Sequence, residues 1–226
     1  AKAAQCSALV LTLDLQILGQ RHADIRNGLS IPLKIKLSNL FDLLSKPSWC
    51  YQMARTKNRT FGNVMGHVKD ITNLNSLTKW VQDQFDTRLN WDDVKRIKDW
   101  WGGKLIIKGI MDPDDAKMAQ KCGADALVVS NHGGRQLDGV NSSISTLPEI
   151  KKAVSNMEVL MDGGISSGQD ILKAIAMGAE GVMIGRSFVY GLSAGGKEGV
   201  TKSLEILNKE LDMTMALCGR RDIKDV

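Results

Sequence analysis

The sequence lacks the patterns that mark several large classes of protein. Its four cysteines, Cys6, Cys50, Cys122 and Cys218, lie far apart and form no Cys-x-x-Cys pair. We therefore expect free thiols in a reducing, cytoplasmic location rather than a disulfide framework or a zinc site. No apolar run reaches the roughly 18 residues that a membrane-spanning helix needs. The net charge is +5, but the basic residues form no long run, so no nucleic-acid partner is expected.

What the sequence does contain is a repeated junction between a helix and a strand. The segments AAQCSALVLTLD (residues 3–14), AQKCGADALVVSN (119–131) and AIAMGAEGVMIGR (174–186) each run from a helix end through a short turn into an apolar stretch. Short apolar stretches without alternation are typical of strands buried on both faces of a parallel sheet. With KLIIKG (104–109) and EVLMDGG (158–164) they predict five strands, near residues 9–14, 104–108, 126–130, 158–162 and 181–185.

Helices with readable ends separate these strands. Asp112 and Pro113 can begin a helix that ends at Gly123, and Ser166 or Ser167 can cap another that ends at Gly178. Such regular units favour the α/β class and a (β/α)8 TIM barrel, whose usual size is about 250 residues. Only about five of its eight units are found here. The first residues also enter in mid-pattern, so we interpret the chain as N-terminally incomplete.

One segment interrupts this rhythm. Residues 20–97 are polar with scattered aromatic residues, and we interpret them as a long insertion within one domain spanning 1–226, over the active-site face or at an oligomer contact. Short helices are expected there near 38–55, 76–84 and 91–101. The final segment, 197–217, has apolar residues at helical spacing and predicts an amphipathic helix packed on the barrel.

Polar residues cluster where the predicted strands end, which in such barrels is the catalytic face. Two sets stand out. Paired glycines after one strand and Gly-Arg after the next favour a phosphate site built from backbone N–H groups: Asp162, Gly163, Gly164, Gly185 and Arg186. A histidine with a carboxylate, a lysine and two arginines favours acid–base chemistry on a carboxylate substrate: His132, Asp14, Lys108, Arg21 and Arg135.

Each of these residues also has a structural interpretation. A single histidine at a strand end more often serves the fold, Asp14 could cap the next loop, and Asp162 could fix the Gly-Gly turn. Lys108 has few such explanations, because burying an unpaired lysine is costly. The functional interpretation gains weight because all the candidates fall on the same face.

The stretch SNHGGRQLDG (130–139) resembles the active-site signature of the FMN-dependent α-hydroxy acid oxidases and dehydrogenases. The similarity spans essentially all 226 residues and includes LVLTLD with GQRHADIRNG, LIIKGI, DGGISSGQDILKAIAMGAEGVMIGR and MTMALCG. The insertion is most similar to that of the bacterial quinone-linked L-lactate dehydrogenases. The resemblance implies an FMN-dependent oxidation of an L-2-hydroxy acid, L-lactate first, to the 2-oxo acid.

The resemblance also implies a role for each candidate. His132 would be the base that takes the substrate proton, and Asp14 would stabilise the resulting imidazolium. Arg135 and Arg21 would bind the substrate carboxylate. Lys108 would stabilise the charge that develops on the reduced flavin. The remaining contacts to FMN would come from Thr12, Ser130, Asp162, Gly163, Gly164, Gly185 and Arg186.

One departure concerns the phosphate turn, where the family has arginine and this chain has Ser166. The family's first three strands, with a substrate-binding tyrosine and several flavin contacts, have no counterpart here, so we expect weak FMN binding and slow turnover. The partners implied are the hydroxy acid, an electron acceptor (quinone, cytochrome or oxygen) and other copies of the full-length chain in a homo-oligomer. Any membrane contact would be peripheral, on the cytoplasmic face of the inner membrane, and mediated by residues 20–97.

Two other interpretations stay open. Another FMN-binding or phosphate-binding barrel enzyme would explain the glycine turns but not His132, Arg135 and Asp14 together. A cofactor-free remnant of a barrel would keep the same residues without activity. Flavin absorbance of the chain with and without added FMN separates the three.

Overall fold

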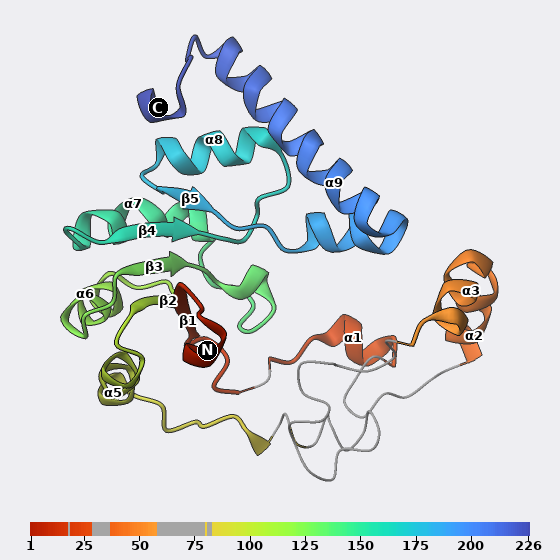
Figure 1. Cartoon of the computed structure of the whole chain (residues 1–226), viewed down its shortest axis with the longest axis horizontal. Helices are drawn as coiled ribbons and strands as arrows, with labels where there is room; N and C mark the ends of the chain where they lie inside the picture. Colours follow the sequence, from red (N-terminus) through yellow and green to blue (C-terminus); the bar gives the residue numbers. More distant parts are fainter. Residues whose placement is uncertain (18, 29–36, 58–79, 81–82) are drawn as a thin grey trace. The chain divides into compact units, whose positions relative to one another are not determined.

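The structure is a computed structural model that describes residues 1–17, 19–28, 37–57, 80 and 83–226. The chain divides into two compact units. The first comprises Ala1–Ile17 and Thr87–Val226, and the second comprises Leu18–Asp86. Figure 1 traces the elements of both along the chain. Because the two units are not placed relative to one another, each is described by itself.

The first unit is built on a five-stranded parallel sheet with the strands in chain order. The strands are β1 (Ala8–Thr12), β2 (Lys104–Ile110), β3 (Ala126–Val129), β4 (Glu158–Met161) and β5 (Gly181–Val182). Every neighbouring pair is parallel, and Thr12 of β1 lies opposite Lys108 of β2. The five predicted strands are therefore confirmed, although β5 is shorter than expected. This order is that of a partial (β/α)8 barrel.

Helices connect and cover these strands (Figure 1). In the first unit they are α5 (Trp91–Trp101), α6 (Pro113–Lys121), α7 (Ser143–Ala153), α8 (Gly168–Ala176) and α9 (Arg186–Leu217), with 3-10 turns η1 (Lys2–Ala4), η2 (His132–Gly134) and η3 (Ile223–Asp225). The predicted caps are confirmed. The Asp112 side chain accepts from the Asp114 N–H at the start of α6, and Ser167 forms a capping box with Asp170 at the start of α8.

The expected terminal helix over 197–217 is present as the second part of α9, after a break at Gly195 and Gly196. It packs on α8 very closely, since a Cβ on Gly168 would lie 2.0 Å from the Leu211 backbone nitrogen. Leu207 of this helix is buried, whereas Leu204 is half exposed. The amphipathic prediction is therefore confirmed for the face that carries Leu207.

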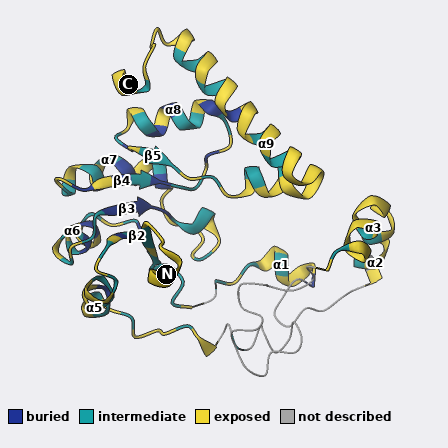
Figure 2. Ribbon diagram, in the orientation of Figure 1, coloured by how far each residue is buried: buried dark blue, intermediate teal, exposed yellow. Residues whose placement is uncertain are grey.

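The expectation that the strands are buried on both faces is correct only for β3, whose four residues are all buried (Figure 2). In β2 and β4 burial alternates, with Leu105, Ile107 and Val159 fully buried. Val10 of the edge strand β1 is 47% exposed. The reason is that one face of the sheet packs against the helices, while the other face of these strands is less covered.

The repeated sequence pattern has a structural counterpart at the start of the strands. Asp125, just before β3, accepts hydrogen bonds from Lys98 and Lys104 and from the Leu105 N–H of the preceding strand. Glu180, just before β5, accepts from the Val159 N–H in the same way. These bonds, chiefly the one from Lys98, hold the pKa of the Asp125 carboxyl well below its usual range. The second and third repeats therefore each tie an acidic residue to the neighbouring strand.

The described part of the second unit contains α1 (His22–Arg26), α2 (Leu37–Leu44) and α3 (Pro47–Arg55). The helix expected over 38–55 is thus two helices, divided near Pro47, and the Cys50 thiol of α3 contacts the Leu43 carbonyl of α2 at 3.3 Å. The helix expected over 76–84 falls mainly outside the described residues. None of the helices that the structure describes is long and apolar enough to cross a membrane.

Candidate active site

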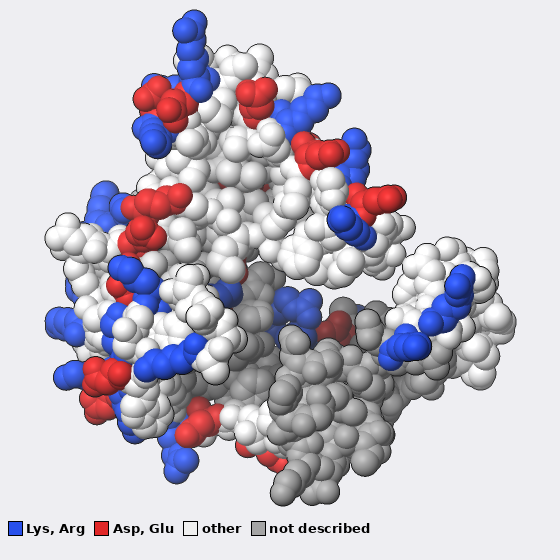
Figure 3. Space-filling model, in the orientation of Figure 1, with Lys and Arg blue, Asp and Glu red and all other residues white. Residues whose placement is uncertain are grey.

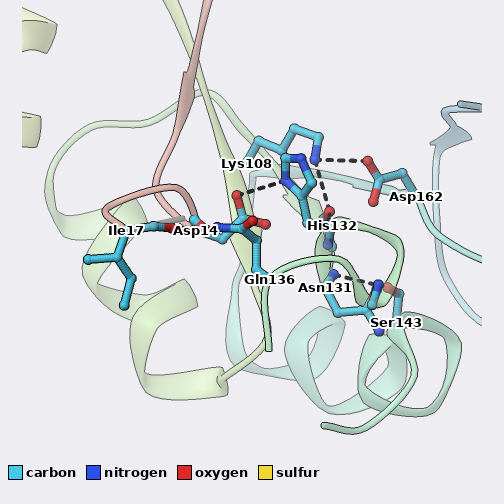
Figure 4. Close-up of polar contacts among 10 residues, drawn as sticks. Asp14, Ile17, Lys108, Asn131, His132, Gln136, Ser143 and Asp162 are labelled. Carbon is cyan, nitrogen blue, oxygen red and sulfur yellow. Dashed lines mark hydrogen bonds and ion pairs between the residues drawn. The ribbon is translucent and has the colours of Figure 1, made fainter. Parts of the chain in front are cut away.

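Side chains from the ends of β1, β2, β3 and β4 converge at one edge of the sheet (Figure 4). One pair is His132 and Asp14, which are 118 positions apart in sequence, with Nδ1 of the imidazole 3.2 Å from Oδ1 of the carboxylate. Both side chains are partly buried, at 26% and 16% exposure. An ionised carboxylate only accepts hydrogen bonds, so the pairing places the imidazole proton on Nδ1 and leaves the Nε2 lone pair as a base.

The position of Asp14 depends on a glycine in the neighbouring strand. The pairing of β2 with β3 shifts register between Lys108 and Ile110, and Gly109 at this irregularity has φ +104°. A Cβ there would lie 2.8 Å from both Cβ and Cγ of Asp14. Only glycine therefore lets the Asp14 turn lie this close to β2.

Lys108 lies between two oxygen acceptors from neighbouring strands. Its ammonium donates to the Ser130 hydroxyl at 2.9 Å and lies 2.9 Å from Oδ2 of Asp162. The lysine side chain is 13% exposed, so its charge is neutralised at a largely dehydrated position. The other oxygen of Asp162, like Oδ2 of Asp14, is buried without a hydrogen-bond partner in the structure. Unsatisfied acceptors of this kind are suited to donors from a bound molecule.

His132 sits in an unusual backbone segment. It has φ +56°, and Gly133 and Gly134 that follow also have positive φ. Its N–H donates to the Ser130 hydroxyl at 3.1 Å. Asn131 fastens the segment, since its side-chain oxygen accepts from the Gly134 N–H at 3.2 Å and its amide nitrogen donates to the Asn141 carbonyl. Several side chains thus hold the backbone that presents the imidazole.

Gln136 connects the same loop to the Asp14 turn. Its amide nitrogen donates to the Asp14 carbonyl at 2.9 Å and to the Ile17 carbonyl at 2.8 Å (Figure 4). Its Oε1 is buried without a partner in the structure. This one side chain bridges segments about 120 positions apart.

The predicted phosphate turns lie beside a pocket of about 440 Å³ that Gly163, Gly164 and Arg186 line. Gly163 and Gly164 both have positive φ, and a Cβ on Gly164 or Gly185 would meet no atom within 4 Å. The Arg186 guanidinium donates to the Gly133 carbonyl at 3.4 Å. The pocket is therefore open, and its lining includes backbone turns and a cation.

Ser166, which stands where the family has arginine, is engaged in capping α8. Its N–H and hydroxyl both donate to Asp170 at 3.1 Å. Partial burial acts to raise the pKa of Asp170, but the hydrogen bonds from Ser166 and Ser167 lower it overall. Ser166 therefore contributes to the helix start and brings no charge to the turn.

The remaining predicted residues are placed as follows. Thr12 ends β1 beside Lys108. Arg135 follows η2 on the His132 loop and is exposed. Arg21 belongs to the second unit, where it precedes α1 and lies 3.8 Å from Asp24. The structure thus brings together His132, Asp14, Lys108, Ser130 and Asp162, whereas Arg21 lies in the unit whose placement is not defined.

Sequence reasoning missed two residues of this cluster. Gly109 carried a usable signal, because an isolated glycine within a strand pattern indicates a bulge or a close backbone approach. Gln136 carried none, since a bridge to residues 14 and 17 has no local pattern. Among the described residues, no group of three or more His, Cys, Asp or Glu side chains is suited to a metal ion.

Comparisons with known proteins identify relatives of the chain. The profile of the FMN-dependent dehydrogenase family matches residues 1–226. Proteins named L-lactate dehydrogenase are similar over the whole chain, with 42% identity for that of Haemophilus influenzae (strain PittEE) and 40% for that of Acinetobacter baylyi. The chain spans about 60% of the length of these curated relatives.

Solved structures are similar as well. A monotopic membrane protein, (S)-mandelate dehydrogenase, superimposes with a TM-score of 0.89 at 34% identity, covering 96% of this chain and 57% of its own. A putative lactate oxidase of Pediococcus acidilactici has a TM-score of 0.74 at 34% identity, covering 99% of this chain and 53% of its own.

Proposed function

The chain belongs to the FMN-dependent dehydrogenase family, and we propose that it carries the catalytic face of an enzyme that oxidises an L-2-hydroxy acid, with L-lactate as the substrate. The observation that carries this proposal is the His132–Asp14 pair beside the Lys108 ammonium at the carboxyl ends of the strands. The 42% identity to L-lactate dehydrogenases over the whole chain supports the choice of substrate.

His132 accepts the substrate proton at Nε2 in this proposal. Asp14 orients the imidazole through Nδ1 and stabilises the positive charge that the ring acquires. The partial burial of both side chains strengthens this interaction relative to one in bulk water. Arg135, three residues after His132, binds the substrate carboxylate, and the same role for Arg21 rests on the family resemblance alone.

The residues present fit an FMN group. The unpartnered oxygen of Asp162 can accept from a ribityl hydroxyl, and Lys108 holds a positive charge beside it. The glycine turns and Arg186 line an open pocket of about 440 Å³ that can take a phosphate. Thr12 and Ser130 would complete the set of contacts. When bound, FMN supplies the acceptor for the two electrons that leave the hydroxy acid.

The test is a flavin titration followed by reduction. FMN and riboflavin are added to the chain, and quenching of flavin fluorescence measures binding. We expect weak binding of FMN and weaker binding of riboflavin, because riboflavin lacks the phosphate. The FMN-saturated chain is then mixed anaerobically with L-lactate, glycolate or mandelate. Failure of FMN to bind better than riboflavin would argue against the phosphate site. If none of the hydroxy acids bleached the bound flavin, the result would argue against the proposed oxidation.

A peripheral membrane contact through residues 20–97 is the second part of the proposal. On α2 the residues Leu37, Leu40, Phe41 and Leu44 recur at helical spacing, which normally marks a buried stripe. Here they are exposed, Leu37 by 79% and Phe41 by 72%. A stripe of this kind is suited to the interface of a lipid bilayer.

The neighbouring helix adds amphipathic and basic groups. Trp49, Tyr51 and Met53 of α3 are also exposed, and the Arg55 guanidinium lies 5.4 Å from the Tyr51 ring centre. The visible face of the α2–α3 pair is white with blue Lys and Arg side chains in Figure 3. Basic groups beside exposed aromatic residues favour an anionic lipid surface. The monotopic membrane protein among the similar structures supports this proposal.

Vesicle flotation tests the membrane contact. The chain should float with phosphatidylglycerol vesicles and less with phosphatidylcholine vesicles. Phe41→Asp should weaken binding roughly tenfold or more, since burying a phenylalanine stabilises by about 1.5–3 kcal/mol. Tyr190→Asp changes a similarly exposed aromatic residue of α9, at 67% exposure, and serves as the control. Equal loss in both variants would contradict a role for α2.

A further inference from the structure

The Gln136 side chain bridges the loop that carries His132 and the turn that carries Asp14, in addition to the His132–Asp14 contact itself. Both hydrogens of its amide are used, one for the Asp14 carbonyl and one for the Ile17 carbonyl. Residues 14 and 17 are three positions apart, so the amide spans the whole turn. The turn therefore has a fixed position relative to the loop.

The two carbonyls also define which way the amide points. If the amide were rotated by half a turn, Oε1 would face two carbonyl oxygens and the repulsion would replace both hydrogen bonds. The observed orientation leaves Oε1 buried without a partner among the described residues. This orientation leaves one buried oxygen unsatisfied, which costs about 1–3 kcal/mol. It also forms two hydrogen bonds from Gln136 to the turn.

The backbone of the loop is strained, so hydrogen bonds to a neighbouring segment stabilise its conformation. Left-handed backbone at a residue with a side chain costs about 1–2 kcal/mol, and His132 has φ +56°. Asn131 and Ser130 hold the loop to its own strand end, but they do not reach the Asp14 turn. The 3.2 Å contact between the imidazole and the carboxylate is a second link between the two segments.

We propose that Gln136 is a positioning residue that holds the Asp14 turn against the His132 loop and thereby fixes the tautomer of His132. It touches neither substrate nor cofactor and acts only through the backbone of residues 14 and 17. With the turn in place, Asp14 accepts from Nδ1–H and the lone pair stays on Nε2. With the turn released, the imidazole returns to the Nε2–H form that a free imidazole prefers, and it loses its basic nitrogen on the substrate side. This inference rests on the proposed role of His132 as the base.

The tautomer can be measured without flavin or activity. The chain has three histidines, His22, His67 and His132, so ring-¹⁵N labelling gives three sets of signals, and His132→Gln identifies the one of interest. The spectrum is recorded at about pH 8.5, where an ordinary imidazole is neutral. The expected result for the unaltered chain is an Nδ1–H tautomer at His132. In Gln136→Glu, which has the same shape but directs an oxygen at the two carbonyls, the Nε2–H form should predominate.

Matched variants distinguish positioning from general loss of structure. Gln136→Met removes the two donors without adding charge and should give the same change of tautomer. Gln120→Glu is the control, because the Gln120 amide also donates to a backbone carbonyl, that of Ser155, far along the chain from the site. It should leave the His132 signals unchanged. With FMN bound, Gln136→Met should slow reduction by L-lactate roughly tenfold or more while the lactate concentration for half-maximal rate stays the same.

The outcomes separate this inference from the proposed function. An Nε2–H tautomer in the unaltered chain would contradict the role of His132 as base and leave Gln136 nothing to position. An Nδ1–H tautomer that survives in both Gln136 variants would overturn the positioning role while leaving the base role intact. A change in the Gln120→Glu control as large as that in the Gln136 variants would also overturn it, since the effect would then be a general one.

Discussion

Replacing Gly109 by alanine should separate Asp14 from His132. The added methyl group would lie 2.8 Å from Cβ and Cγ of Asp14 and 3.0 Å from its backbone nitrogen, closer than real Cβ contacts come. Because backbone atoms of the turn are among the neighbours, the turn itself must move. We expect the Nδ1–H tautomer of His132 to be lost together with the 3.2 Å contact.

The expected loss of stability in Gly109→Ala is the sum of two separate effects. Gly109 has φ +104°, and left-handed backbone costs a residue with a side chain about 1–2 kcal/mol. Forcing an extra methyl group into a packed site adds about 1–3 kcal/mol. Gly139→Ala is the matched control, since Gly139 has φ +78° but no atom within 4 Å of its Cβ position. It should therefore show the first term alone.

Urea denaturation of the two variants measures both terms. Gly109→Ala should lower the free energy of unfolding by about 2–5 kcal/mol, and Gly139→Ala by about 1–2 kcal/mol. The difference between the two losses estimates the energetic cost of the close contact between the new methyl group and Asp14. Equal losses of stability, with the His132 tautomer unchanged in Gly109→Ala, would refute the reasoning that Gly109 sets the position of Asp14.

Three further predictions concern charge. Asp125→Asn should destabilise the fold by about 1.5–3 kcal/mol near pH 7; because the folded pKa of Asp125 is depressed, this contribution is complete above the ordinary carboxyl pKa of about 3.9 and is lost as the pH falls below it. Urea denaturation at several pH values should show the gap narrowing progressively as the pH falls below about 3.9, and a constant gap would contradict the ion-pair account. Lys108→Met should lower the free energy of unfolding by about 2–3 kcal/mol, because it leaves the Asp162 carboxylate unpaired; this is somewhat less than for a fully buried pair. Adding Asp162→Asn should recover part of the lost stability. No recovery in the double variant would argue against the ion pair. Ser166→Arg should tighten FMN binding by roughly tenfold without affecting riboflavin, as measured by fluorescence quenching, since it restores a cation at the phosphate turn; equal tightening for both flavins would point to a site away from the phosphate.

Much of the fold could be predicted because its signals are local. Asp112 with Pro113 and Ser167 with Asp170 mark helix starts through hydrogen bonds within a single turn. The strand ends bring His132 and Lys108 to one edge because parallel strands share a direction. The strand boundaries were less accurate, since β5 depends on its pairing with β4 and contains only two residues.

What the sequence could not provide is contact between distant segments. The bridge from Gln136 to residues 14 and 17 depends on how two loops meet, and no spacing along the chain encodes that meeting. Burial on both faces was overestimated for β2 and β4, because an apolar run indicates hydrophobicity but not which neighbours cover it. The exposed stripe on α2 has the pattern of a buried helix, and only the structure shows that it is uncovered.

The central claim is that His132 is the base of an FMN-dependent hydroxy acid dehydrogenase site. Its most direct test is anaerobic bleaching of bound FMN by L-lactate, compared between the unaltered chain and His132→Gln at equal flavin occupancy. The account predicts slow bleaching of the unaltered chain and a rate lower by roughly a hundredfold or more in the variant, the range that general-base catalysis contributes. Equal traces for the two proteins, whether both bleach or neither does, would contradict it.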